Sequence, residues 1–168
     1  MNLYGLPGRD QATEAWMTDL LKKLALGQGG WQLQSYRHWQ SGLEPDVGFE
    51  AIRVAVSDTD MVVAKSLGTL VLLTAAAGNV SPASAVLIGV PLVAYDAERR
   101  ASLREFAAAR PTLFIQQTGD VTGSYDELAD VVRGISTVTL AEVAGEDHVY
   151  SDTDELKSLI ENWYQSIM

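Results

Sequence analysis

Hydrophobic residues along this chain fall into short apolar runs that alternate with longer segments of helical periodicity. The apolar runs predict six strands, at residues 3–6, 31–36, 61–65, 84–90, 112–117 and 136–143. Segments with apolar residues every three or four positions predict six helices, at residues 10–25, 46–56, 66–77, 97–109, 125–133 and 152–166. This regular alternation of strand and helix predicts an α/β fold.

Several of the predicted strands are apolar at every position instead of alternating between apolar and polar residues. Strands that are covered by crossover helices on both faces have this pattern, so the sheet should be mostly parallel. The chain has neither an internal repeat nor a linker-like segment that would divide it. We therefore expect residues 1–168 to form one domain, a three-layer α/β/α sandwich around a mostly parallel six-stranded sheet.

Two of the predicted helices carry more detailed expectations. The first should end near Ala25, because Gly27, Gly29 and Gly30 follow it. The helix at residues 46–56 should bury a stripe formed by three apolar residues, Phe49, Ile52 and Val56.

Composition narrows the classes of function. The chain has 168 residues, of which 47% are hydrophobic and 20% charged, as in ordinary globular proteins. A net charge of −10 argues against a nucleic-acid ligand and an anionic membrane, since both attract basic surfaces. The absence of cysteine excludes disulfides, thiolate metal ligands and a cysteine nucleophile.

Cofactor and targeting signals are also missing from the sequence. No histidine pair has metal-ligand spacing, and the glycines at 27–30 precede a strand, not the helix that a phosphate-binding loop requires. The N-terminus lacks the pattern of a signal peptide, and every apolar stretch is far shorter than the roughly 20 residues of a membrane span. We expect no metal, no cofactor and no membrane span, and a cytoplasmic location.

The strongest functional signal lies where the apolar run at 61–65 stops at Ser66. Ala64 and Gly68 flank this serine, and a helical segment follows it. A strand, a tight turn with small flanking residues and a helix are the sequence shape of a nucleophile elbow, in which the serine Oγ is exposed. A second interpretation is that Ser66 only caps the following helix, and this would be preferred if Ser66 stood alone.

Two further functional groups follow other strands. In a parallel sheet the carboxyl ends of all strands meet at one edge, where ligands bind. Ser66 follows the third predicted strand, Asp120 the fifth and His148 the sixth. Asp126 and Asp147 are alternative acids, but Asp126 falls within a predicted helix and Asp147 directly precedes the histidine. A structural histidine is the alternative interpretation of His148.

This order of groups on this fold resembles the α/β-hydrolase superfamily, and within it the small lidless serine hydrolases. The resemblance rests on four segments, Ala64-Lys65-Ser66-Leu67-Gly68, Arg110 to Asp120, Gly145-Glu146-Asp147-His148 and Tyr4-Gly5-Leu6-Pro7-Gly8. The last of these is similar to the His-Gly-x-x-Gly oxyanion loop of the family, with tyrosine in place of histidine. Together the segments extend over nearly the whole chain.

The resemblance implies a carboxylesterase-like serine hydrolase. Ser66 would be the nucleophile, His148 the general base and Asp120 the acid that orients it. The backbone N–H groups of Leu6 and Leu67 would form the oxyanion hole. The implied reaction cleaves an ester, thioester or related acyl bond of a small-molecule substrate through an acyl-enzyme.

Three side chains are candidates for lining the site: Tyr4, Lys65 and His38. Lys65 would either attract an anionic substrate or pair with an acidic side chain, and the ion pair is the preferred interpretation. His38 follows the second strand at the same edge of the sheet, although an ordinary loop histidine is the simpler interpretation.

The chain departs from the family in lacking two leading strands and a lid insertion after the fourth strand. The predicted sheet is therefore the minimal core of the fold, and the site should be open or completed by a partner. These departures motivate a rival hypothesis, a non-catalytic α/β-hydrolase-like module that binds a partner or ligand. They would also leave the strand at 31–36 as a sheet edge, through which a homodimer could form.

Overall fold

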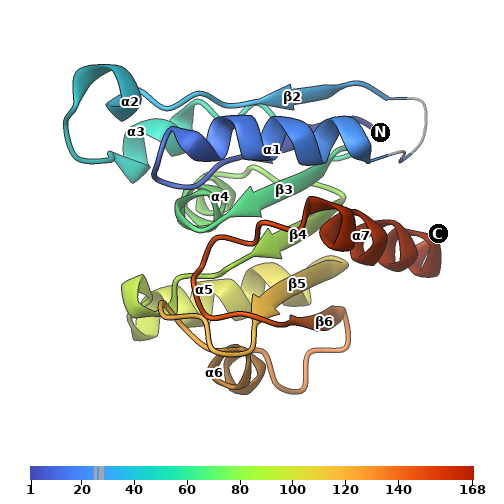
Figure 1. Cartoon of the computed structure of the whole chain (residues 1–168). Coiled ribbons are helices and arrows are strands. Elements are labelled where there is room, and N and C mark those ends of the chain that lie inside the picture. Colours follow the sequence, from blue (N-terminus) through green and yellow to red (C-terminus); the bar gives the residue numbers. More distant parts are fainter. Residues whose placement is uncertain (25, 27–28) are drawn as a thin grey trace.

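A computed structural model of the chain describes residues 1–24, 26 and 29–168, and it contains a six-stranded sheet whose strands are all parallel (Figure 1). The strands are β1 (Leu3–Leu6), β2 (Trp31–Leu33), β3 (Met61–Lys65), β4 (Ser84–Ile88), β5 (Thr112–Gln117) and β6 (Val138–Val143). Their order across the sheet is β2-β1-β3-β4-β5-β6, so β2 is an edge strand as predicted. The predicted α/β fold class is confirmed.

Helices cover both faces of this sheet (Figure 1). They are α1 (Ala12–Lys23), α2 (His38–Ser41), α3 (Val47–Ile52), α4 (Leu67–Ala77), α5 (Ala97–Ala108), α6 (Tyr125–Val131) and α7 (Thr153–Ile167), with a short 3-10 helix, η1 (Leu92–Ala94). Helices α1 and α7 pack on one face of the sheet, and α3, α4, α5 and α6 pack on the other. The predicted end of the first helix near Ala25 and Gly27 lies outside the described residues.

The two faces explain the apolar pattern of the strands. Every residue of β3, β4 and β5 is buried, because alternate side chains enter one core beneath α1 and α7 and another beneath α4 and α5. Burying one large aliphatic side chain contributes about 1.5–3 kcal/mol, so these central strands hold the sheet together. All six strands end at the same edge, which is where Ser66, Asp120 and His148 follow them.

The region between β2 and α3 differs from the prediction. Strand β2 ends at Leu33, three residues early, because the next side chain, Gln34, turns into the core to accept from Tyr4 and donate to Glu50. Helix α2 occupies a segment that was expected to be a loop. It is held by His38 and Trp39, whose ring nitrogens both contact the carbonyl of a distant residue, Arg9. These contacts come from outside the segment, so local periodicity could not indicate them.

The predicted stripe of α3 is wrong at Ile52, which is 87% exposed, and the helix ends there. The helix instead buries Ala51 and the side chain of Glu50, which is 1% exposed. Its carboxylate accepts hydrogen bonds from the Arg37 backbone N–H (2.8 Å), Arg53 Nη1 (2.6 Å) and Gln34 Nε2 (3.1 Å). Burial of a charge is tolerated where hydrogen bonds of this kind compensate it.

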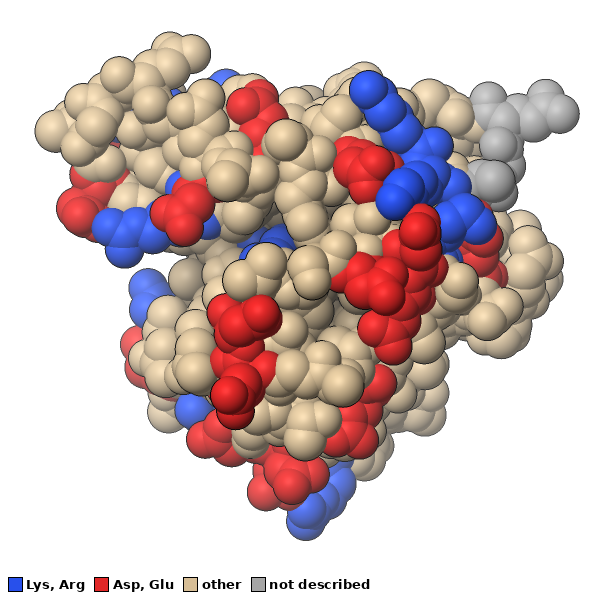
Figure 2. Space-filling model, in the orientation of Figure 1, with Lys and Arg blue, Asp and Glu red and all other residues tan. Residues whose placement is uncertain are grey.

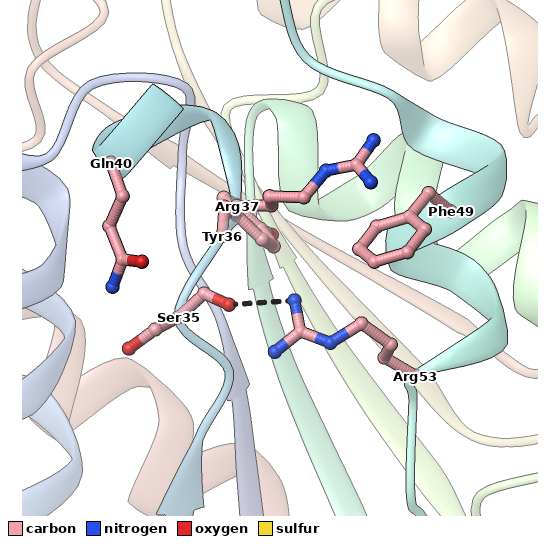
Figure 3. A pocket seen from close by; sticks show the side chains of 6 residues that line it. All are labelled: Ser35, Tyr36, Arg37, Gln40, Phe49 and Arg53. Atoms are coloured by element: carbon pink, nitrogen blue, oxygen red, sulfur yellow. Dashed lines mark hydrogen bonds between the residues drawn. The ribbon is translucent and has the colours of Figure 1, made fainter. Parts of the chain in front are cut away.

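A small pocket of about 200 Å³ lies between the end of β2 and α3, and Figure 3 shows the six side chains that line it. Arg37 stacks over the Phe49 ring, with its guanidinium carbon 3.8 Å from the ring centroid. Arg53 reaches across the pocket from the other side and donates to the carbonyl of Ser35. The side chains around the pocket thus connect α3 to the segment that follows β2.

We expect Glu50→Gln to lower the free energy of unfolding by about 2–3 kcal/mol, because the amide has only one acceptor oxygen for three donors. The measurement is a urea unfolding curve. Glu44→Gln is the matched control, because Glu44 is 83% exposed and pairs with Arg9 at the surface. Equal unfolding midpoints for the Glu50 variant and the wild type would contradict the prediction.

Acidic side chains outnumber basic ones on the face shown in Figure 2, in agreement with the net charge of −10. Among the described residues, no helix is both long and apolar enough to cross a membrane. The same residues contain no group of three or more His, Asp or Glu side chains arranged to hold a metal ion.

Candidate active site

Ser66 lies in the turn between β3 and α4 with φ 50° and ψ −114°, a backbone conformation that non-glycine residues rarely adopt. Its backbone N–H donates to the carbonyl of Ile88 at the end of β4 (3.0 Å), which ties the turn to the sheet. The hydroxyl makes no helix-capping hydrogen bond. Instead Oγ lies 2.8 Å from Nε2 of His148. The capping interpretation of Ser66 is therefore wrong.

Gly68 allows the elbow to lie directly against the end of β1. A Cβ atom at this position would collide with the Leu6 carbonyl oxygen and lie 2.8 Å from the carbonyl oxygen of Pro7. Both obstacles are backbone atoms, so neither can move aside by a change of rotamer.

We expect Gly68→Ala to reduce the free energy of unfolding by about 1–3 kcal/mol, because the added methyl group pushes the elbow and the β1 end apart. Turnover should fall as well, since the same displacement moves Ser66. Urea unfolding and an ester-hydrolysis assay measure the two effects. Gly30→Ala is the control, because a Cβ there meets nothing within 4 Å. A Gly68 variant with the stability and activity of the control would refute this account of the elbow.

The ring of His148 connects Ser66 to Asp120. Nδ1 lies 2.8 Å from Asp120 Oδ2 and 3.0 Å from Oδ1. The His148 side chain is 18% exposed, whereas that of Asp120 is fully buried. Of the alternative acids, Asp126 is exposed on α6, and Asp147 bonds to Gln117 and to the Val149 backbone instead. Asp120 is thus the acid that contacts the histidine ring.

The segment between β6 and α7 carries His148 back across the ends of the neighbouring strands (Figure 1). The side chain of Gln117, the last residue of β5, makes two hydrogen bonds to this segment. Its Oε1 accepts from the His148 backbone N–H (2.8 Å), and its Nε2 donates to the Asp147 carboxylate (2.9 Å). Both His148 (φ 63°) and Tyr150 (φ 59°) have left-handed backbone conformations. Tertiary contacts must stabilise such a segment, since each of these residues costs about 1–3 kcal/mol.

The Asp120 carboxylate has additional donors. Thr122 donates to Oδ1 through its backbone N–H and its hydroxyl, both at 2.8 Å, and the hydroxyl of Tyr150 donates to Oδ2 at 2.7 Å. Burial raises the pKa of Asp120, but the hydrogen bonds from His148, Tyr150 and Thr122 outweigh it, so the pKa lies below its ordinary value. The carboxylate is therefore ionised at neutral pH.

Burial, and next the hydrogen bond to Asp120, raise the pKa of Tyr150, which keeps its phenol protonated as a donor. Gln117, Thr122 and Tyr150 were not predicted from the sequence. Each of these residues supports the site through hydrogen bonds to partners that lie 2 to 33 positions away in the chain. Such contacts leave no local pattern in the sequence.

A pocket of about 570 Å³ opens beside Ser66. One wall consists of Ala12, Thr13 and Trp16 of α1, and Val149 of the histidine segment also lines the pocket. The loop between β1 and α1 contributes a further wall, formed by Gly8, Arg9 and Asp10. The pocket therefore combines apolar surface with polar groups next to the serine.

One of the three side chains that were predicted to line the site lies in the pocket, and two do not. Lys65 lines the pocket, but Tyr4 and His38 do not. Tyr4 is buried on the sheet face that α3 and α4 cover, where its hydroxyl donates to Gln34. The ring of His38 contacts the carbonyl of Arg9, a residue that lines the pocket, but His38 is not itself part of the lining.

The preferred interpretation of Lys65 as half of an ion pair is wrong. Within the described part of the chain, no carboxylate lies within 4.0 Å of its ammonium group. Nζ donates to the carbonyl oxygen of His148 at 3.1 Å instead.

Leu6 and Leu67 were predicted to supply oxyanion donors. Leu67 is the first residue of α4, where backbone N–H groups have no partner within the helix. Leu6, the last residue of β1, is completely buried, pairs with Ala64 of β3 and lies against Gly68 of the elbow.

Comparisons with known proteins show where this arrangement has been seen. No protein-family model and no curated protein matches the sequence. The structure is similar to YbtT, a type II thioesterase from the yersiniabactin NRPS/PKS biosynthetic pathway, with 14% identity, a TM-score of 0.62 and coverage of 98% of this chain and 91% of that chain. The chain has the α/β-hydrolase fold. A serine-to-alanine mutant of YbtT matches with the same values.

A second α/β-hydrolase neighbour is ClbQ from the colibactin NRPS/PKS pathway, with 11% identity, a TM-score of 0.59 and coverage of 99% of this chain and 96% of that chain. The predicted resemblance in fold is therefore confirmed over nearly the entire chain. At these identities the likeness concerns the α/β-hydrolase fold alone, and the chemistry has to be argued from the site.

Proposed function

We propose that this protein is a serine hydrolase that cleaves an ester, thioester or related acyl bond of a small-molecule substrate. The observation that carries the proposal is the continuous chain of hydrogen bonds from Ser66 through His148 to Asp120, with 2.8 Å at both contacts of the ring. Three separate strand ends supply these groups. Their order along the chain, serine, acid and histidine, is also that of α/β-hydrolases.

The proton positions on the histidine follow from its partners. The ionised Asp120 can only accept, so Nδ1 of His148 carries the proton of that hydrogen bond. Nε2 of the neutral ring is then the acceptor and faces the Ser66 hydroxyl. His148 removes the hydroxyl proton as Oγ attacks the acyl carbon, and it returns that proton to the leaving alcohol or thiol. Water repeats the sequence on the acyl-enzyme and releases the acid.

The oxyanion of the tetrahedral intermediate needs backbone donors near Ser66. We assign one donor to the N–H of Leu67, at the positive end of α4. The second donor in our proposal stays the predicted N–H of Leu6, which lies against Gly68 just before the loop that lines the pocket at Gly8, Arg9 and Asp10. Hydrogen bonds from His38 and Trp39 to the Arg9 carbonyl give this loop a fixed backbone.

The pocket suits the acyl part of the substrate. Its apolar lining includes Ala12, Trp16 and Val149, which would exclude water from a hydrocarbon chain next to Ser66. The neighbours YbtT and ClbQ both belong to NRPS/PKS pathways, and YbtT is a type II thioesterase. Thioesters therefore belong in the substrate panel beside carboxylic esters.

The test is covalent labelling with a fluorophosphonate, followed by mass spectrometry of the labelled peptide. We expect one phosphonyl adduct, on Ser66. Hydrolysis of a series of p-nitrophenyl esters and matching acyl thioesters, with Ser66→Ala as control, then measures the preferred acyl group. A wild-type protein that is neither labelled nor active would reject the proposal and favour the non-catalytic binding module.

A further inference from the structure

Lys65 is the last residue of β3 and immediately precedes Ser66. It is 4% exposed, although it carries a charge. Its ammonium group lies 5.5 Å from the ring centroid of Trp16 and 5.6 Å from that of Tyr150, within the range of cation–π attraction. Its hydrogen-bond acceptor is the His148 carbonyl oxygen. Every one of these partners lies in α1 or in the segment that carries His148.

A buried ammonium group is costly, and burial lowers the pKa of Lys65 despite the more distant carboxylates of Asp120, Asp10 and Asp147. An apolar side chain of similar length would avoid this cost. What the apolar side chain would lose is the hydrogen bond to the His148 carbonyl. The free-energy cost of burying the Lys65 ammonium group is therefore retained together with one specific hydrogen bond, the one to the His148 carbonyl.

That segment requires external support, because His148 and Tyr150 both have positive φ angles. Three side chains from three different elements hold its backbone. Lys65 of β3 donates to the carbonyl of His148, and Gln117 of β5 accepts from the N–H of the same residue. Trp16 of α1 donates through its indole nitrogen to the carbonyl of Tyr150 at 2.8 Å.

We propose that Lys65 is a positioning residue that, together with Trp16, holds His148 at the correct distance from Ser66. The strand that leads into the nucleophile thereby also anchors the base, through its last residue, which directly precedes Ser66. The effect on catalysis rests on the proposed hydrolase function. The anchoring itself is a structural property of the segment from His148 to Tyr150.

The alternative role for Lys65 is to bind an anionic group of the substrate, since it also lines the pocket. Two observations disfavour it. The ammonium group is already directed at the His148 carbonyl and two aromatic rings, and the pocket wall includes the carboxylates of Asp10 and Asp147, which would repel an anion. The two roles predict different kinetic changes.

The kinetic test compares Lys65→Met, which keeps the length of the side chain, with Lys65→Arg, which keeps charge and donors. We expect Lys65→Met to lower kcat by about 10- to 100-fold, with KM within about twofold of the wild type, because the base is displaced. Lys65→Arg should recover most of the loss. Lys22→Met, an exposed lysine on α1, is the control. A raised KM with unchanged kcat would overturn the proposal in favour of substrate binding.

A second comparison asks whether Lys65 acts through His148. In a His148→Ala background, Lys65→Met should cause no additional loss of the residual activity, because the group that it positions is missing. An equal loss in both backgrounds would show that Lys65 acts independently of the histidine and would overturn the proposal.

A measurement without substrate separates this proposal from the function itself. In the proton NMR spectrum, the Nδ1 proton shared by His148 and Asp120 should give a downfield signal in the wild type and in Lys65→Arg. We expect this signal to broaden or disappear in Lys65→Met and in Trp16→Phe, whose folding is checked by thermal unfolding. An unchanged signal in both folded variants would refute the anchoring, whatever the protein hydrolyses. If Lys65→Met does not fold, Trp16→Phe alone gives the answer.

Discussion

Replacing Ser66 with alanine is expected to lower the rate of acyl hydrolysis by about 10⁴- to 10⁶-fold, because the nucleophile of the acyl-enzyme is lost. The fold should persist. The Ser66 hydroxyl bonds to His148 and caps no helix, so its loss leaves α4 intact. The measurement is kcat on the best ester or thioester of the panel, with the thermal unfolding midpoint recorded in parallel.

A serine with the opposite role provides the control for this experiment. Ser124 caps α6. Its hydroxyl accepts from the Glu127 backbone N–H, and the Glu127 carboxylate accepts from the Ser124 backbone N–H. Ser124→Ala should cost about 1 kcal/mol of stability and leave turnover unchanged. If Ser66→Ala behaves like Ser124→Ala, losing stability and keeping activity, Ser66 is a structural residue and not the nucleophile.

Asp120→Asn is expected to reduce kcat by about 10⁴-fold, because the amide enforces the wrong histidine tautomer. The Thr122 N–H and hydroxyl both donate to Oδ1, so the amide oxygen must take that place. The NH₂ group then replaces Oδ2, which is 2.8 Å from Nδ1 of His148, and Nδ1 has to accept a hydrogen bond. The proton moves to Nε2, where it prevents His148 from taking the proton of Ser66.

Asp126→Asn removes the same charge from a nearby exposed position on α6 and should leave kcat unchanged. The comparison therefore isolates the hydrogen-bonding geometry from the net charge. Both variants are measured with saturating substrate across a range of pH. An Asp120 variant that loses no more activity than the Asp126 variant would mean that the acid has no part in orienting His148.

The ends of the central strands could be predicted from the sequence, because these strands are buried on both faces. Burial forces β3, β4 and β5 to be apolar throughout, and the run stops where each strand reaches the edge of the sheet. Ser66 could therefore be located from the break in its own run, and Asp120 from the break after Gln117. The order of strands in space was not needed for this, since all parallel strands end at one edge.

Local patterns failed wherever a distant partner decides the conformation. Helix α2 exists because His38 and Trp39 bind the carbonyl of Arg9, which is about 30 positions away. Ile52 has the spacing of a buried residue, yet α3 buries Glu50 and Ala51 instead. Two of the three donors to the Glu50 carboxylate, Gln34 and the Arg37 N–H, lie 16 and 13 positions away. Hydrophobic periodicity contains no information about polar partners.

Sequence by itself determined the alternation of strands and helices, the parallel sheet and the three groups at its edge, because each follows from the apolar pattern of one continuous segment. Only the tertiary structure decided that Asp120 contacts the His148 ring and that Tyr150 and Thr122 support Asp120. It also decided the partner of Lys65. These contacts join residues up to 83 positions apart, and their geometry arises only when the strands are brought side by side.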